Sequence, residues 1–199
     1  FVGDLINKWP KSAEVVEFVR NRPNTWSVIG NHEYFSFPDE KMLWDIDDEK
    51  LILREWWKNW VYTQKEKSKP LEAVLRKNGN LDWIKSLPVI IEKETFIVVH
   101  GGLHPEYGLE TPKEIATLIR LHEWRPWYEF YTGTKPIIYG HWALDGLRIR
   151  PNTIWLDTGC CFGWHLTAYC IETGEIWQVR ANAVYREPWH WQEKMEFNF

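Results

Sequence analysis

Four short stretches of this chain place a glycine beside a side chain that can bind a metal ion or transfer a proton. They are Gly3-Asp4, Gly30-Asn31-His32, His100-Gly101-Gly102 and Gly140-His141. Each follows a short apolar run of the kind that forms a buried strand. Loops at the carboxyl ends of strands are where α/β proteins bind ligands, and glycine lets the backbone approach closely. If these strands are neighbours, the polar side chains meet at one rim of a sheet.

The side chains expected at that rim are Asp4, Asn31, His100 and His141. One carboxylate, one amide oxygen and two imidazoles suit a divalent transition metal such as manganese, iron, cobalt or zinc. A calcium or magnesium site would take more oxygen donors. A transition metal would polarise a phosphoryl oxygen and lower the pKa of a bound water. His32, next to the amide donor, is placed to protonate a leaving group.

The composition indicates an ordinary globular chain that forms one domain over residues 1–199. Hydrophobic residues make up 44% of the chain and charged residues 26%, which is typical of folded proteins. The net charge of -4 argues against an extended nucleic-acid surface. No apolar run reaches the roughly 18 residues of a membrane span. We therefore expect a small-molecule substrate and no membrane partner, and composition leaves the oligomeric state open.

The cysteines are too few and too closely spaced for a secreted disulfide framework. They are Cys160, Cys161 and Cys170. Packing is the expected role of all three, and a cytoplasmic location is the expected compartment.

The elements that must position the polar residues can be read from the apolar pattern. Residues 10–21 predict a helix, and strands are predicted within 24–33, 95–102 and 136–142. The block from 36 to 87 is charged, rich in tryptophan and helical in pattern, and we expect it to be a helical cap or insertion. Residues 111–124 predict a further helix, with Thr111 as N-cap and Glu114 completing a capping box.

The last part of the chain predicts strands, with a hairpin turn at the sequence ETGE, residues 172–175. Alternating strands and helices followed by late strands indicate an α/β fold. We expect four layers, α/β/β/α, with two mixed sheets packed between helices.

The motifs GDLINKWP, GNHE, VVHGG and YGHWA, in that order, resemble the signature series of the calcineurin-like metallophosphoesterases. The resemblance covers nearly the whole chain except residues 36–87. It is closest to the branch that holds symmetrical bis(5'-nucleosyl)-tetraphosphatases and serine/threonine protein phosphatases. The stretches YGHWALDG, LDTGCCFG and LTAYCIETGE are most similar to the tetraphosphatase side.

The resemblance implies a role for each matching residue. Asp4 would bridge two divalent metal ions, expected to be manganese with iron, cobalt, nickel or zinc as alternatives. One metal shell would be completed by Asn31, His100 and His141. His32 would be the general acid, and Lys8 would hold phosphate. Arg125 is a candidate for a second phosphate contact, with a surface ion pair as the alternative.

The chain departs from the family pattern in two respects. The family's N-terminal strand and first metal motif, Asp-x-His, are missing upstream of Asp4, so the second metal is expected to lack those ligands. Tryptophan stands at Trp9, Trp155 and Trp164, where small residues are expected. Bulk at these positions predicts an altered pocket.

A group of aromatic side chains in the 36–87 block has two readings. Trp56, Trp57, Trp60 and Tyr62 would stack a purine or pack inside the cap.

The expected activity is a metal-dependent phosphoesterase that hydrolyses diadenosine tetraphosphate symmetrically to two ADP. A serine/threonine protein phosphatase is the first alternative. The second is a catalytically impaired module that binds phosphate or a nucleotide.

Overall fold

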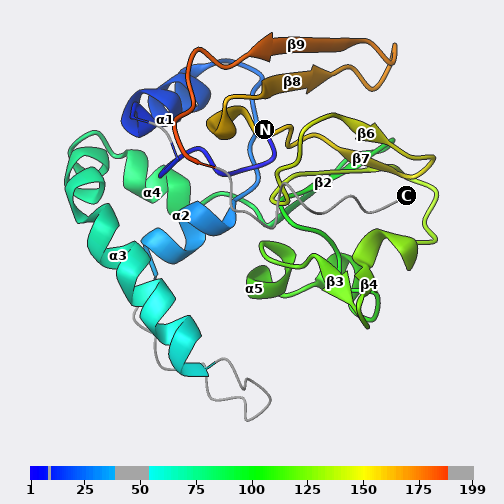
Figure 1. Ribbon diagram of the computed structural model, residues 1–199, viewed down its shortest axis with the longest axis horizontal. Coiled ribbons are helices and arrows are strands. Elements are labelled where there is room, and N and C mark those ends of the chain that lie inside the picture. The colour runs from blue at the N-terminus through cyan, green and yellow to red at the C-terminus, as the bar shows by residue number, and fades with distance from the viewer. Residues whose placement is uncertain (9, 39–53, 188–199) are drawn as a thin grey trace.

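The computed structural model describes residues 1–8, 10–38 and 54–187. Trp9 and residues 39–53 of the predicted cap lie outside these ranges. Figure 1 shows the longer helices gathered on one side of the molecule, with the strands on the other. None of the described helices is long and apolar enough to cross a membrane. The helices on that side are α1 (Ser12–Asn21), α2 (Asn31–Ser36), α3 (Arg54–Lys77) and α4 (Asn80–Lys85).

Apolar side chains from three of these helices form one buried cluster with the loop that follows Asp4. Val16 and Val19 of α1 pack with Leu75 of α3 and with Leu5 and Ile6 of the loop. Both loop residues are nearly inaccessible to solvent. Packing against these helices therefore fixes the position of the loop that follows Asp4. Of the apolar residues that predicted a helix over residues 10–21, Val16 and Val19 are buried in α1, whereas Phe18 is 57% exposed.

A five-stranded sheet with the order β1-β2-β5-β7-β6 forms the other side. The three central strands are parallel, and the two edge strands run antiparallel to their neighbours. Because β2 and β5 are parallel neighbours, the residues that follow them emerge at the same edge. The mixed α/β class is confirmed. The strands are β1 (Ile90–Glu92), β2 (Ile97–Val99), β5 (Ile137–Tyr139), β6 (Arg148–Ile149) and β7 (Thr153–Trp155).

The turn predicted at ETGE is confirmed. It joins β8 (His165–Tyr169) to β9 (Ile176–Arg180), and Gly174 closes it with a φ of 73°. Short 3₁₀ helices lie in the connections between strands. They are η2 (Gly108–Glu110), η3 (Trp127–Glu129) and η4 (Cys160–Phe162).

The helix predicted over residues 111–124 is wrong beyond one turn. Helix α5 spans only Lys113–Ala116, and its N-cap is Pro112 rather than Thr111. A small hairpin follows, in which β3 (Leu121–His122) pairs with β4 (Arg125–Pro126). The strand predicted within residues 24–33 is also absent. Residues 25–30 form no strand, residues 31–33 begin α2, and the backbone N–H of Val28 donates to the carbonyl of Phe1.

Tryptophan at the tip of the β3–β4 hairpin occupies a backbone conformation that favours glycine. Glu123 and Trp124 have φ angles of 46° and 66°, and Trp124 is 94% exposed. Two-residue hairpin turns with positive φ at both positions prefer glycine at the second. We therefore expect Trp124→Gly to raise the free energy of unfolding by about 1 kcal/mol, as measured by urea denaturation. An unchanged or lower stability would show that the indole makes stabilising contacts.

The two described tryptophans that were expected to disturb a pocket are both packed. Trp155 on β7 is 2% exposed, and its ring centroid lies 5.8 Å from that of Tyr139 and 5.5 Å from that of Trp142. Trp164 packs against Phe162 beside η4. The bulk at these two positions is thus accommodated within apolar clusters.

Candidate active site

Two facing glycines bring the Asp4 loop onto the start of α2. A Cβ added to Gly3 would lie 2.7 Å from the backbone nitrogen of Gly30, and one added to Gly30 would lie 2.3 Å from Asp4 Oδ1. The backbone N–H of His32 donates to Asp4 Oδ1 over 3.1 Å. Asp4 has a φ of 58°, in the left-handed region. The carboxylate is therefore aimed at the helix start by a backbone that tolerates no bulk at either glycine.

Glu33 holds this loop from the buried side. Its carboxylate accepts hydrogen bonds from the backbone N–H groups of Asp4, Ile6 and Gly30, at 2.9, 3.1 and 2.8 Å. Burial and the nearby Asp4 carboxylate raise the pKa of Glu33 to about 7. Glu33 was not among the predicted site residues. Its place three residues after Gly30, at the third position of α2, is the signal of a capping glutamate.

The side chains expected at the rim lie in contact. Asn31 Oδ1 is 3.0 Å from His100 Nε2 and 2.9 Å from His141 Nδ1, and His100 Nε2 is 3.2 Å from Asp4 Oδ1. His100 follows β2 and His141 follows β5, as the parallel sheet requires. His141 has a φ of 69°, which turns its ring back toward Asn31. Burial lowers the pKa of His141 well below its usual value, so its ring is neutral near pH 7.

The donor and acceptor roles of the atoms in these contacts fit a bound cation. His100 Nδ1 lies 2.6 Å from the carbonyl oxygen of Val2, which can only accept, so Nδ1 carries the ring proton. In the neutral ring, Nε2 then presents a lone pair toward the oxygens of Asn31 and Asp4. No hydrogen lies between these three facing acceptor atoms, an arrangement that a positive ion stabilises. An imidazole whose second nitrogen donates to a backbone carbonyl is also the usual form of a metal-binding histidine.

Among the residues that the structure describes, no group of three or more His, Cys, Asp or Glu side chains already has the arrangement of a metal cluster. This holds also for the three members of these types in the candidate set, Asp4, His100 and His141, whose fourth donor is the amide of Asn31. Its donor atoms lie at hydrogen-bonding distance from one another. The donor chemistry nevertheless fits a divalent ion.

Basic groups surround the Asp4 carboxylate. Lys8 Nζ lies 3.2 Å from Asp4 Oδ2, and His32 Nε2 lies 3.9 Å from the same atom. Burial alone would raise the pKa of Asp4, but His100, His32 and Lys8 hold it well below the usual range. Burial, together with Lys8 and His100, lowers the pKa of His32 to about 3. The site thus contains a permanent anion beside a buried lysine and a neutral imidazole.

Two further charged residues near the site were not found from the sequence. Arg120 lies between α5 and β3, with its guanidinium over the Trp142 ring, 5.9 Å from the centroid. Burial lowers its pKa, whereas Asp157 and Asp4 act in the opposite direction. Asp157, after β7, also acts on Lys8. In the folded chain, Arg120 is therefore a second cation on which the charges of Asp157 and Asp4 act.

Arg125 is placed differently from the other candidates. Its guanidinium pairs with Glu129 at 2.7 Å on the surface, where 61% of the Arg125 side chain is exposed. It also lies over the Phe130 ring, 5.0 Å from the centroid. The structure thus shows the surface ion pair that was the alternative for this residue.

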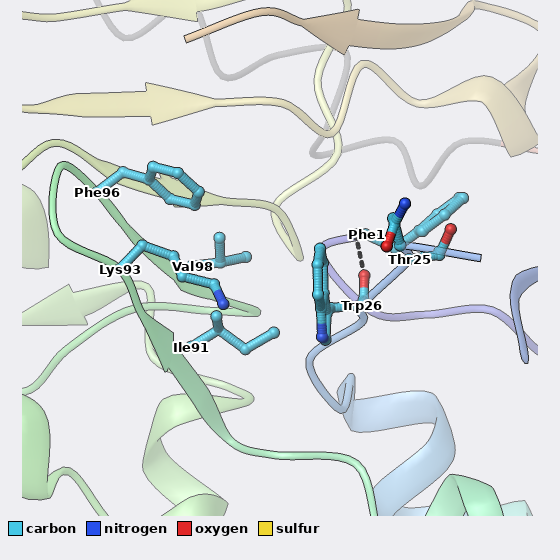
Figure 2. Close-up of a pocket in the computed structure, with 8 residues that line it drawn as sticks. Phe1, Thr25, Trp26, Ile91, Lys93, Phe96 and Val98 are labelled. Atoms are coloured by element: carbon cyan, nitrogen blue, oxygen red, sulfur yellow. Dashed lines mark hydrogen bonds between the residues drawn. The ribbon is translucent and has the colours of Figure 1, made fainter. Parts of the chain in front are cut away.

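A separate groove of about 340 Å³ lies between the N-terminal segment and the β1–β2 hairpin. Figure 2 shows Phe1, Trp26, Ile91, Phe96 and Val98 around it. Lys93 lies over the Trp26 ring, 4.7 Å from the centroid. Among the described residues, no carboxylate or imidazole lines this groove, so these residues supply none of the chemistry found around Asp4.

A family model described as calcineurin-like phosphoesterase matches residues 1–165. A symmetrical bis(5'-nucleosyl)-tetraphosphatase of Coxiella burnetii (strain Dugway 5J108-111) is 23% identical over 255 aligned residues, covering 94% of this chain and 82% of the relative. The Shewanella frigidimarina protein of the same name is 50% identical over 58 residues, or 27% of this chain and 21% of the relative.

A solved structure of a candidate diadenosine tetraphosphatase superposes with a TM-score of 0.62 at 24% identity, covering 92% of this chain and 80% of that one. At this identity the superposition shows a shared fold.

Proposed function

Because this chain belongs to the calcineurin-like phosphoesterase family, and is therefore a hydrolase, we propose that it splits diadenosine tetraphosphate symmetrically into two ADP molecules. The observation that carries the proposal is the group of facing acceptors from Asp4, Asn31 and His100, with Lys8 beside them. The names of the Coxiella and Shewanella relatives support the choice of substrate.

We propose that Asp4, Asn31, His100 and His141 hold a divalent ion, with manganese as the native metal. When bound, the ion polarises the phosphoryl group and lowers the pKa of a water molecule. Lys8 and Arg120 neutralise charge on the non-bridging phosphoryl oxygens. An anion bound beside His32 favours the protonated ring, which then donates its proton to the leaving phosphate oxygen.

The products distinguish this reaction from its alternatives. The chain, supplied with manganese, is incubated with diadenosine tetraphosphate, and the nucleotides are separated by anion-exchange chromatography. ADP as the sole product is expected, because symmetrical cleavage breaks the central anhydride bond. ATP together with AMP would contradict symmetrical cleavage.

Two controls complete the experiment. A sample treated with a chelator should form no ADP, and formation of ADP there would contradict the metal requirement. Phosphate release from a phosphoserine peptide, without dinucleotide cleavage, would favour the protein phosphatase. Binding of ADP without any turnover would favour the impaired binding module.

A further inference from the structure

Helix α3, from the block predicted to be a cap or an insertion, carries a polar residue on a buried face. Val61, Ser68 and Leu75 are spaced seven residues apart, so they lie on one face of the helix, and each is at most 1% exposed. Leu75 packs into the apolar cluster that includes the loop after Asp4. A buried hydroxyl costs free energy unless it has a hydrogen-bond partner. The place of Ser68 in this apolar line is therefore explained by what it contacts.

The partner of Ser68 is Asn7, which directly precedes Lys8. Ser68 Oγ lies 3.3 Å from Asn7 Nδ2 and 3.4 Å from Asn7 Oδ1. The same amide nitrogen donates to Ser36 Oγ of α2, and the backbone N–H of Asn7 donates to Ser12 Oγ of α1 over 3.1 Å. Serine hydroxyls from three helices thus hold Asn7 in place.

The backbone at Asn7 has a conformation that favours glycine. Its φ is 72°, in the left-handed region that asparagine enters more readily than most residues. The next residue along the chain is Lys8, whose Nζ lies 3.2 Å from Asp4 Oδ2. Ser68 is 61 positions from Asn7 in the sequence, yet only the Asn7 side chain separates it from the turn that carries this lysine.

We propose that Ser68 is a positioning residue for phosphate binding. By holding the Asn7 amide, it keeps the turn that presents the Lys8 ammonium beside Asp4. The inference rests on the proposed function, in which Lys8 neutralises charge on the phosphoryl oxygens. Ser68 itself contacts no substrate in this role, because its side chain is buried against Asn7. Helix α3 thereby connects the 36–87 block to the candidate active site.

The first test measures the steady-state kinetics of the protein supplied with manganese. Ser68→Ala should raise KM for diadenosine tetraphosphate about three- to tenfold with kcat little changed, because one hydrogen bond that orients a binding group is lost. No rise of KM in this variant would overturn the proposal.

Thr167→Ala, on β8, is the matched control. Its hydroxyl is also buried, lies 2.6 Å from Thr158 Oγ1 and accepts a hydrogen bond from Gln178 Nε2 over 3.0 Å. The substitution therefore removes comparable contacts that involve neither Asn7 nor Lys8, and KM should stay unchanged. An equal rise of KM in the Thr167 and Ser68 variants would assign the effect to lost hydrogen bonds in general and contradict the proposal.

A double-mutant cycle distinguishes the positioning of Lys8 from a general loss of stability. Lys8→Met removes the ammonium, so adding Ser68→Ala to this variant should change KM no further. If Ser68 only stabilises the fold, Ser68→Ala raises KM by the same factor with or without Lys8, and the proposal is wrong. Should Ser68→Ala fail to fold, Asn7→Gly provides the same cycle, because glycine keeps the left-handed turn and lacks the amide.

ADP binding keeps the inference separate from the reaction. In isothermal titration of the manganese-supplied protein with ADP, Ser68→Ala should weaken binding about three- to tenfold, but not in the Lys8→Met background. If the wild type binds ADP without hydrolysing the dinucleotide, the proposed function fails, and this comparison still decides the role of Ser68. If the wild type is active and the affinity changes equally in both backgrounds, or in neither, the role of Ser68 alone fails. A wild type that neither binds ADP nor hydrolyses the dinucleotide would contradict both.

Discussion

Replacing His32 by alanine should lower kcat for diadenosine tetraphosphate by about 10²- to 10⁴-fold, the usual contribution of a general acid. The bound metal should be retained, because the ring of His32 lies outside the group of facing acceptors. The contact that holds Asp4 comes from the backbone N–H of His32, at 3.1 Å, and survives the substitution. In the described part of the chain, Nδ1 of the ring is buried without a hydrogen-bond partner.

Metal content by mass spectrometry and the choice of leaving group make this prediction specific. The loss should be much smaller with p-nitrophenyl phosphate, because a nitrophenolate departs without protonation. His165→Ala, on β8, serves as a control that should keep full activity. If His32→Ala loses its metal, or loses equal activity on both substrates, His32 is not a general acid.

Replacing Gly30 by alanine should lower the free energy of unfolding by about 3 kcal/mol or more, at the upper end of overpacking effects. The added Cβ would lie 2.3 Å from Asp4 Oδ1, 2.4 Å from the Asp4 backbone nitrogen and 2.7 Å from Glu33 Oε2. Backbone and a buried carboxylate cannot move away as a flexible side chain can. The same displacement separates Asp4 from Asn31, so metal affinity should fall as well.

Urea denaturation of Gly30→Ala and Gly108→Ala distinguishes this steric clash from the free-energy cost of placing alanine in a left-handed conformation. Gly108 has a φ of 52°, and an added Cβ there meets no atom within 4 Å. The Gly108 variant should therefore lose only about 1–2 kcal/mol, the cost of a left-handed alanine, and keep its metal. Equal losses of unfolding free energy in the two variants would mean that the Asp4 loop moves away from the added methyl group at little cost.

The sequence predicted those parts of the fold that are determined by interactions between residues close together in the chain. The apolar runs before His100 and His141 became the neighbouring parallel strands β2 and β5, and the ETGE turn closed β8 onto β9. The glycines next to Asp4 and Asn31 indicated close approach of two backbones, which the structure shows. Each of these features depends on residues that are adjacent in the chain.

Features that depend on tertiary packing were not predictable in the same way. Arg120 lies within the segment predicted as a helix, and only the folded chain shows that its charge reaches Asp4 and Asp157. The hairpin that follows it was hidden because Trp124 occupies a turn position that glycine usually marks. A turn signal that relies on glycine fails when a bulky residue adopts a positive φ.

Asp4 and His141 both hold left-handed backbone conformations, with φ angles of 58° and 69°. Such a conformation costs an L-residue about 1–2 kcal/mol, and glycine relieves the cost. Glycine at either position would also remove a donor from the proposed metal site. A laboratory selection for thermal tolerance alone would therefore favour changes at two residues that the chemistry requires. Variants evolved for heat resistance would have to gain it elsewhere in the chain to remain active.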